Sequence, residues 1–445
     1  MSAIARYYLQ RGLNVGGYDK TPTLLTRELE REGALIHFVD DIHQIPETFL
    51  DEAETLVVYT PAIPVEHTEL QYFLAHHFDV QKRAQVLGML TRTYKGLCVA
   101  GTHGKTTTSS MTAHLLHQSH VDCNAFLGGI TKNYGTNYIL APESEYVVIE
   151  ADEYDRSFHW LAPYATVITA TDPDHLDIYG TEDAYLESFR HYTELIRRGG
   201  YLIIHEGLKM HPHVIEGVTT YTYNRNSGDF HAENIRMGGG EIHLDLVSPF
   251  GNIMDIELGV PVGINIENGI AAMALAQIAG ATAEEIRSGM ASFGGVDRRF
   301  DFHVKNSYKA YLSDYAHHPE EIRQSIRSIR EVYPDKRIVG IFQPHLYTRT
   351  RDFYLEFADA LSQLDEVILT EIYPARELPI EGVTSQLILD HLRPGVAHRL
   401  IRKADVLDVV RSLDFDVLIT LGAGDLDDYA GQIAEIVAHE YASSI

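Results

Sequence analysis

Short apolar runs alternate with amphipathic stretches along most of this chain. Near its start, apolar positions that share one helix face precede Gly12, and a second amphipathic stretch ends at Gly33. Each is followed by a short apolar run, at residues 13–19 and 34–40. The first pattern predicts helices that end at glycine, and the second predicts strands. Their alternation predicts an α/β protein with a parallel sheet and helices on both faces.

The same pattern returns in two further parts of the chain. After residue 90, apolar runs predict strands at residues 96–100, 145–152 and 165–172. Residues 238–261 alternate as antiparallel strands do, and 267–293 have the spacing of two helices. A third part follows a Gly-Gly pair, with strands predicted at 337–345, 366–374 and 416–424. Because 445 residues exceed the usual size of one domain, we expect three, at 1–89, 90–295 and 296–445.

Composition and charge narrow the class of protein. Hydrophobic residues make up 45% and charged residues 22%, as in ordinary globular proteins. The 36 Lys and Arg against 63 Asp and Glu give a net charge of −27, so neither nucleic acid nor an anionic membrane is expected as a partner. Two cysteines without a CxxC pair indicate a reducing compartment. No export signal or membrane-length apolar run is present, so we expect a cytoplasmic protein.

One glycine-rich segment carries the strongest sign of chemistry. An apolar run and a predicted helix enclose Gly101, Thr102, His103, Gly104, Lys105, Thr106 and Thr107. In such a turn, glycines let backbone N–H groups approach phosphates, Lys105 reaches the outer phosphates and the Thr106 hydroxyl can ligate Mg²⁺. The spacing is shorter than in the general GxxxxGK[ST] pattern. An ordinary turn with a solvated lysine is the alternative.

Acidic and histidine side chains follow the next two predicted strands. Glu150 ends the run 145–152, and His175 follows the run 165–172. Since ligands of α/β sheets bind at the carboxyl ends of the strands, Glu150 is a candidate metal ligand and His175 could hold a second ion or its water. The alternative is that these are solvated loop ends.

Two polar clusters follow strands of the third part. The first contains Asp314 and Tyr315, and the second contains His345 and Arg349. Histidine and arginine at a strand end offer donors for a carboxylate or phosphate. An exposed basic turn is the alternative.

Taken together, these segments resemble the Mur ligase family, whose members extend peptide stems on UDP-linked muramic acid. Six motifs occur in the family's order across essentially the whole chain: GTHGKTTT, EADEYD, DPDHLDIYG, GGVDRRFD, SDYAHHPEE and FQPHLYTRTRD. The resemblance implies three α/β domains, namely a Rossmann-like UDP-binding domain, a central P-loop ATPase domain with a mainly parallel sheet, and a C-terminal Rossmann-like domain.

The resemblance also implies an activity. RRFD and FQPH followed by YTRT favour the branch that uses ATP to join L-alanine to UDP-N-acetylmuramate through an acyl phosphate. The alternatives are the recycling ligase that attaches a tripeptide to the same substrate, and a nucleotide-binding regulator that performs no ligation. The expected cofactors are ATP and Mg²⁺, and Mn²⁺ can take the place of Mg²⁺. The chain is expected to be a monomer or homodimer.

Roles follow residue by residue from the resemblance. The catalytic residues are Lys105, Glu150 and His175, and the metal ligands are Thr106, Glu150 and His175. ATP is expected on the loop 101–107 and on Asn268, Arg299 and Asp314. The substrates are expected on Asp19, Asn137, Tyr315, His345 and Arg349.

Three positions depart from the family pattern. The family opens with a strand and a glycine-rich loop that receives the UDP diphosphate, whereas this chain begins with Met1-Ser2 where that motif would end, so we expect that strand and loop to be missing. Ile264 stands where histidine is common, which puts one adenine contact in doubt. Ser313 stands where an aspartate is frequent, which leaves Asp314 as the remaining acid.

Overall fold

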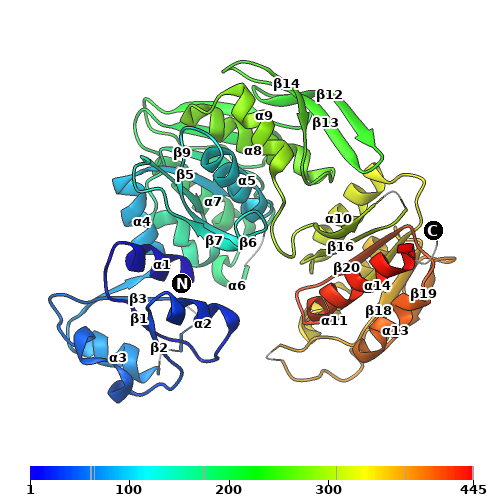
Figure 1. Cartoon of the computed structure of the whole chain (residues 1–445), viewed down its shortest axis with the longest axis horizontal. Coiled ribbons are helices and arrows are strands. Elements are labelled where there is room, and N and C mark those ends of the chain that lie inside the picture. The colour runs from blue at the N-terminus through cyan, green and yellow to red at the C-terminus, as the bar shows by residue number, and fades with distance from the viewer. Residues whose placement is uncertain (61–62, 65, 174–175, 307, 376, 443–445) are drawn as a thin grey trace.

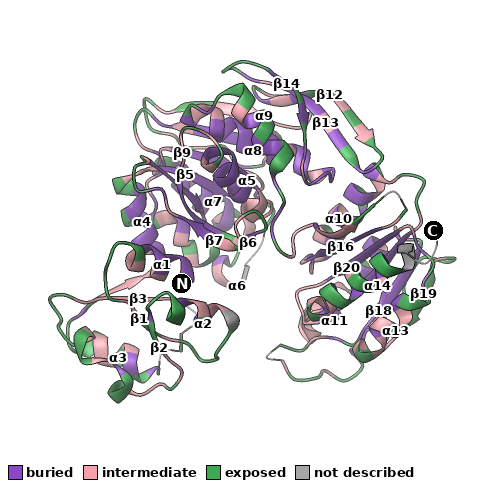
Figure 2. Ribbon diagram, in the orientation of Figure 1, coloured by how far each residue is buried: buried purple, intermediate pink, exposed green. Residues whose placement is uncertain are grey.

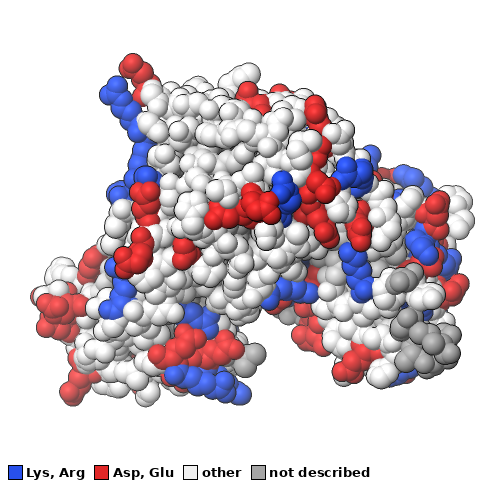
Figure 3. All heavy atoms as spheres, turned by 45° about the horizontal axis from the view of Figure 1, so that its top comes forward, with Lys and Arg blue, Asp and Glu red and all other residues white. Residues whose placement is uncertain are grey.

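The computed structural model describes residues 1–60, 63–64, 66–173, 176–306, 308–375 and 377–442. Its three parts form an arch, with the central part above the N-terminal and C-terminal parts (Figure 1). This confirms the predicted three-part α/β architecture. In the space-filling view the molecule is hollowed between its two outer parts (Figure 3). None of the described helices is long and apolar enough to cross a membrane.

The N-terminal part contains short strands. Its elements are α1 (Ser2–Gln10), β1 (Gly16–Tyr18), α2 (Leu24–Arg31), β2 (Leu35–His37), β3 (Leu56–Tyr59), α3 (Thr68–Ala75), β4 (Asp79–Lys82) and α4 (Arg83–Thr93). The strands form two separate parallel pairs, β1–β2 and β3–β4, where one sheet was expected. Each pair joins only three or four residues per strand, and no residue of β1, β2 or β3 is fully buried.

Helix α1 packs against the central part as well as its own. Ile4 and Tyr7 belong to the apolar cluster under the central sheet, and the Tyr7 ring meets Phe126 edge-on at 5.7 Å between centroids. Arg6 forms a 2.8 Å ion pair with Glu32 and also donates to the Thr136 hydroxyl at 3.4 Å. The helix therefore joins the two parts.

The central part is built on a seven-stranded sheet of order β11-β10-β9-β5-β8-β6-β7, in which all neighbours are parallel except β6 and β7. Its elements are β5 (Lys95–Ala100), α5 (Lys105–His117), β6 (Asn124–Thr131), β7 (Thr136–Ile139), β8 (Tyr146–Glu150), β9 (Ala165–Ile168), α6 (Leu176–Tyr179), α7 (Glu182–Glu194), β10 (Tyr201–His205), β11 (Thr219–Tyr223), α8 (Ile264–Ala279) and α9 (Ala283–Ser292). A separate antiparallel sheet holds β12 (His231–Gly238), β13 (Glu241–Val247) and β14 (Ile253–Glu257). The alternation at 238–261 predicts β13 and β14, whereas β12 precedes it.

Strand β5 lies at the middle of this sheet, and its side chains alternate between two cores. Leu97 and Val99 pack on the side of α5 and α8, whereas Cys98 and Ala100 pack on the side of α4 and α7. All four are fully buried, as the continuous apolar run predicts for a central parallel strand (Figure 2). Because β5, β8, β9 and β10 are parallel, the residues that follow them meet at one edge.

The C-terminal part has a six-stranded sheet of order β15-β16-β20-β17-β18-β19, parallel except for β15. Its elements are β15 (Asp301–Lys305), β16 (Ala310–Asp314), α10 (Pro319–Val332), β17 (Ile338–Phe342), α11 (Tyr347–Leu361), β18 (Glu366–Leu369), α12 (Gln386–Leu389), β19 (Ala397–Leu400), α13 (Val406–Arg411), β20 (Val417–Leu421) and α14 (Ala430–Ala442). Every residue of β16, β17, β18 and β20 is buried (Figure 2).

Candidate active site

The glycine-rich loop 101–104 joins β5 to the N-terminus of α5, which begins at Lys105. The Lys105 ammonium donates to the Gly101 carbonyl at 2.7 Å and forms a 2.8 Å ion pair with Glu153. The Glu153 side chain is only 1% exposed, so burial raises the pKa of its carboxyl while the charge of Lys105 opposes that rise. The lysine is thus held beside its own loop by a buried acid.

Helix α8 packs directly against this loop. Asn268 accepts a hydrogen bond from the Thr108 hydroxyl at 3.3 Å and donates to Asn265 at 3.1 Å. Gly104 has a φ of +80°, and a Cβ added there would lie 2.7 Å from the Asn268 side-chain oxygen. Only glycine therefore fits the loop at this point.

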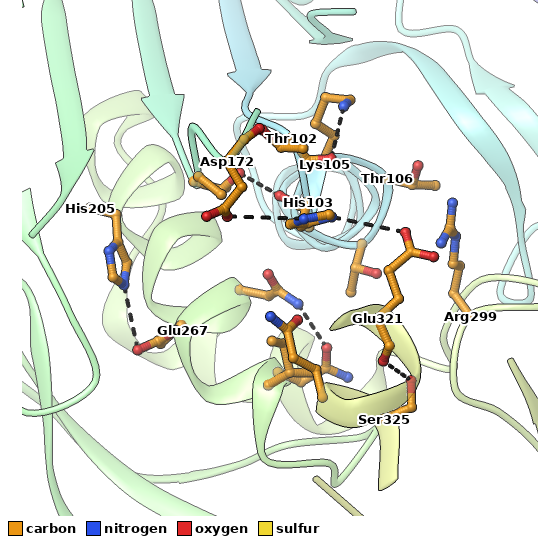
Figure 4. Close-up of a pocket in the computed structure, with 18 of the residues that line it drawn as sticks. Thr102, His103, Lys105, Thr106, Asp172, His205, Glu267, Arg299, Glu321 and Ser325 are labelled. Carbon is orange, nitrogen blue, oxygen red and sulfur yellow. Dashed lines mark hydrogen bonds and ion pairs between the residues drawn. The ribbon is translucent and has the colours of Figure 1, made fainter. Parts of the chain in front are cut away.

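A cavity of about 430 Å³ opens over the loop and reaches from the central part to the C-terminal part. Thr106 and Arg299 lie at one end of it, and His205 and Glu267 lie at the other (Figure 4). His103 projects between them, 4.0 Å from a carboxylate oxygen of Asp172 and 3.9 Å from one of Glu321. Because Lys105 is paired with the buried Glu153 at the edge of this cavity, the alternative of an ordinary turn with a solvated lysine does not hold.

Glu150, at the end of β8, lines this cavity and also a second one of about 470 Å³. The Gly128 amide donates to its carboxylate at 3.2 Å, and a Cβ at Gly128 would lie 2.3 Å from the same oxygen. The glycine therefore leaves room for the carboxylate and orients it. Glu150 stands where the two cavities meet.

The second cavity lies between the N-terminal and central parts and is lined by Lys82 and Arg83. Lys82 forms a 2.8 Å ion pair with Asp155, and Asp155 raises the pKa of that ammonium. Asp155 and its neighbour Arg156 both have positive φ, at 53° and 54°. Two consecutive residues in this region are unfavourable, so the surrounding contacts must hold the segment in place.

The C-terminal part supplies the opposite wall of the first cavity. Asp314, the last residue of β16, is 6% exposed and accepts a 2.5 Å hydrogen bond from the Ser325 hydroxyl. Burial raises the pKa of Asp314 to about 6 despite that bond and the nearby Arg299. Burial would also favour the neutral form of Glu321, but His317 and Arg299 outweigh it and lower the pKa of Glu321.

Tyr315 lies beneath two guanidinium groups. The Cζ atoms of Arg298 and Arg299 lie 4.8 and 5.1 Å from its ring centroid. Arg298 is fixed by Asp427 at 3.2 Å, whereas no hydrogen bond or ion pair to a described residue holds the Arg299 guanidinium. Arg299 is therefore the one of the pair that can turn towards an anion in the cavity.

His345 precedes α11, and Arg349 lies in its first turn. Neither residue lines the two cavities, but the His345 ring lies 6.2 Å from that of His317, between centroids. The His345 ring stacks on Tyr373 at 5.7 Å, and burial together with the charge of Arg349 lowers the pKa of His345 to about 4. Within the part of the chain that the structure describes, His345 Nδ1 and Arg349 Nη1 are buried without a hydrogen-bond partner. Buried polar atoms are seldom left unpaired, so these two atoms are candidates for contact with a ligand or a water molecule. An exposed basic turn does not describe this segment.

Two of the expected site residues do not join these groups. Asp19 is exposed after β1, where its carboxylate accepts from the Thr21 amide at 3.1 Å. Asn137 is half-buried on β7 and lines neither of the two cavities. His175 lies outside the described residues.

Several residues in or beside the cavities were missed in the sequence analysis. Glu153 and Glu321 both belong to the quoted motifs, and Glu321 has a recognisable signal because it follows Pro319 as the third residue of a capping box on His318. His205 and Glu267 had weaker signals. His205 ends an apolar strand, and Glu267 lies in the first turn of a helix.

Comparisons with known proteins agree with this arrangement. The Mur ligase family catalytic domain matches residues 1–95, the Mur ligase middle domain matches 99–276, and the Mur ligase glutamate ligase domain matches 298–436. The UDP-N-acetylmuramate–L-alanine ligase of Phocaeicola vulgatus is 65% identical over 98% of this chain and 95% of its own length. The enzyme of the same name from Cytophaga hutchinsonii is 43% identical over 100% of this chain and 96% of its own.

Solved structures give the same result. The UDP-N-acetylmuramate–alanine ligase of Thermotoga maritima superposes with a TM-score of 0.79 at 26% identity, covering 100% of this chain and 97% of that one. A murein peptide ligase from Psychrobacter arcticus shares the fold with a TM-score of 0.64 at 20% identity, over 98% of this chain and 96% of that one. With a glycine-rich loop facing a wall of the C-terminal part and three matching domain models, the chain belongs to the Mur ligase family.

Proposed function

We propose that this protein uses ATP to join L-alanine to UDP-N-acetylmuramate, giving UDP-N-acetylmuramoyl-L-alanine, ADP and phosphate in peptidoglycan synthesis. The proposal rests on one observation above all. Glu150 lines both the cavity that holds the phosphate loop and the cavity that holds Lys82 and Arg83. Two substrates that must exchange a phosphoryl group can therefore meet at this carboxylate. The relatives with this activity, at 43–65% identity, support the same reaction.

The reaction begins with activation of a poor acceptor. A carboxylate resists attack by an amine, so the γ-phosphoryl group of ATP is first transferred to the muramoyl carboxylate, and ADP leaves. The alanine amine then attacks the acyl carbon, and phosphate leaves with the bonding electron pair. Such a transfer needs alignment and charge neutralisation rather than covalent help from the protein. Lys105 and the amides of the loop are suited to the outer phosphates.

Thr106 and Glu150 are suited to hold Mg²⁺. Mg²⁺ is usually held by one or two protein oxygens together with phosphates and water, and bound there it would neutralise charge on the phosphates. The Gly128 amide orients the Glu150 carboxylate, and no group of three or more acidic, histidine or cysteine side chains among the described residues forms a complete metal site. A site completed by phosphate oxygens agrees with both facts.

The C-terminal wall would receive the amino acid. The unpaired Nη1 of Arg349 suits the alanine carboxylate, because guanidinium groups bind carboxylates through two parallel hydrogen bonds. Burial keeps His345 neutral near pH 7, so one of its ring nitrogens can accept a hydrogen bond from the alanine ammonium, which Arg349 cannot do. Tyr315 is proposed for the amino acid as well, and Arg299, whose guanidinium lies over the Tyr315 ring, is proposed for ATP together with Asp314. Asp19 and Asn137 are proposed for the UDP substrate.

Phosphate release tests this function. The full chain is incubated with ATP and Mg²⁺, with UDP-N-acetylmuramate and L-alanine added singly and together. Phosphate should appear rapidly only when both are present, and the nucleotide product should gain one alanyl residue by mass spectrometry. Turnover with the L-alanyl-γ-D-glutamyl tripeptide in place of alanine would instead assign the recycling reaction. Phosphate release that ignores both substrates would remove the ligase assignment.

A further inference from the structure

The cavity has a second carboxylate, Glu267, away from the phosphate loop. Glu267 immediately precedes Asn268 in the first turn of α8. Successive helix residues project about 100° apart, so the two side chains face different parts of the cavity. Asn268 contacts the phosphate-loop helix through Thr108, whereas Glu267 faces His205 at the end of β10 (Figure 4). The phosphate-binding end and this end are thus joined by one helical turn.

Glu267 is held by His205 and Arg225, and Tyr223 packs behind His205. His205 Nε2 lies 3.5 Å from Glu267 Oε1, with side chains 20% and 33% exposed. The buried Tyr223 ring meets His205 edge-on at 5.1 Å. His205, first, and then the main chain and charge of Arg225 lower the pKa of Glu267, so the carboxylate is ionised at neutral pH and can only accept hydrogen bonds. Glu206 is the other acid beside His205.

Apolar surface lies beside this acceptor. Ile264, which replaces the family's usual histidine, lines the cavity one turn from Glu267, and Leu208 lines it as well. When the phosphates of a nucleotide lie on the loop 101–107, the rest of the molecule must extend along the cavity. The far end then offers aliphatic contact for a flat base and a charged acceptor for a hydroxyl or amino group. A carboxylate that binds ribose hydroxyls is a familiar device in nucleotide sites.

We propose that Glu267 accepts hydrogen bonds from the nucleoside of ATP and thereby selects the nucleotide, and that His205 is the residue that positions Glu267. This inference rests on the proposed use of ATP. The nucleoside has two kinds of donor that suit a carboxylate, the ribose hydroxyls and the exocyclic amino group of adenine. Glu267 accordingly acts on nucleotide affinity and not on the phosphoryl transfer.

Nucleotide analogues test the proposal. The kcat and KM of the full chain are measured with ATP, 2′-deoxy-ATP, 3′-deoxy-ATP and purine riboside triphosphate, for the wild type, Glu267→Ala and Glu331→Ala. Glu331 is the matched control, since it also pairs with Arg225, at 3.2 Å, but does not line the cavity. The wild type should use ATP about tenfold better, in kcat/KM, than the analogue that lacks the bound group. Glu267→Ala should lose that preference, whereas Glu331→Ala should keep it.

The pattern of loss identifies the donor. If Glu267→Ala loses the preference for ATP over either deoxy analogue, the group bound by Glu267 is a ribose hydroxyl. If it loses the preference for ATP over purine riboside triphosphate, the bound group is the amino group of adenine. His205→Gln, which retains a donor, should preserve more of the preference than His205→Ala, with kcat unchanged in both. Equal preferences in the wild type and Glu267→Ala would overturn the proposal. A wild type that turns over no nucleotide at all would instead overturn the proposed ligase function.

Discussion

The two ends of the candidate active site differ in how their buried polar groups are paired. On the central side, Lys105 is already bonded to the buried Glu153. On the C-terminal side, His345 Nδ1 and Arg349 Nη1 have no hydrogen-bond partner among the described residues. An unpaired buried group costs about 1–3 kcal/mol, so a ligand that pairs these atoms would stabilise the second arrangement. The end at Lys105 is thus the paired end of the site, and the end at Arg349 is the unpaired end, which a bound ligand would complete.

Removing Lys105 should break the paired end most severely. Lys105→Met should lower turnover by about a thousandfold, because a cation on the outer phosphates is lost. It should also lower the free energy of unfolding by about 3 kcal/mol, since Glu153 keeps a buried charge without its partner. Steady-state kinetics and urea unfolding measure the two effects.

A second substitution separates these effects. Adding Glu153→Gln to Lys105→Met removes the buried charge and should restore much of the stability without restoring turnover. Recovery of turnover in the double variant would mean that Lys105 serves only to neutralise Glu153.

The unpaired end should respond through affinity for the amino acid. Arg349→Ala should raise the KM for L-alanine about ten- to a hundredfold and leave the KM for ATP unchanged, because a charge-assisted contact to the second substrate is lost. Arg351→Ala is the control, since Arg351 is 52% exposed and bonded to its neighbour Asp352. Initial rates at varied alanine measure the change. A raised KM for ATP in Arg349→Ala would move this arginine to the nucleotide.

Opposite pH dependences sharpen the comparison further. Burial lowers the pKa of His345 from 6.5 to about 4, so its contribution to stability is present above pH 6.5 and is lost as pH falls towards 4. Burial raises the pKa of Asp314 from 3.8 to about 6, so its contribution is present below pH 3.8 and is lost as pH rises through 6. Between pH 4 and 6 the two oppose each other.

Single variants separate these two contributions. Urea unfolding between pH 4 and 7 should show a smaller loss of stability on acidification for His345→Gln than for the wild type, and a larger loss for Asp314→Asn. Identical slopes in all three proteins would contradict the assigned burial of both groups.

The smallest effect is expected at the solvent-exposed edge of the paired end. Asp172 is 71% exposed and 4.0 Å from His103, a separation at which ion pairs at a surface contribute little. Asp172→Asn should change the KM for ATP by less than about threefold. A tenfold rise in ATP titrations would show that the phosphate end depends on His103 being held by this acid.

The sequence predicts the parts of this fold whose signals are local. The apolar run at 96–100 and the glycine-rich loop after it led directly to β5 and the start of α5. The family resemblance supplied the three-part architecture. The hairpin of β6 and β7 was missed because its strands contain glycine and polar residues and depend on pairing with each other. The separation of β1–β2 from β3–β4 also depends on pairing, which no single segment encodes.

The residues of the candidate site likewise fall into those that a local motif predicts and those that only the folded chain brings together. Lys105, Glu150 and Arg349 stand in motifs, and their types indicate their chemistry. Glu153 stands in a motif as well, but its burial beneath Lys105 depends on how β8 continues after the sheet. The pairing of His205 with Glu267 joins residues 62 positions apart through the meeting of β10 and α8, so only the folded chain brings it into view.

Helix α1 fastens the N-terminal part to the central part. Tyr7 is buried against Phe126 of the central sheet, and Arg6 links Glu32 on the N-terminal side to Thr136 on the central side. A second fastening is the ion pair between Lys82, at the end of β4, and Asp155. Because the strands β1 to β4 bury few residues of their own, these attachments carry much of what holds the N-terminal wall of the second cavity in place.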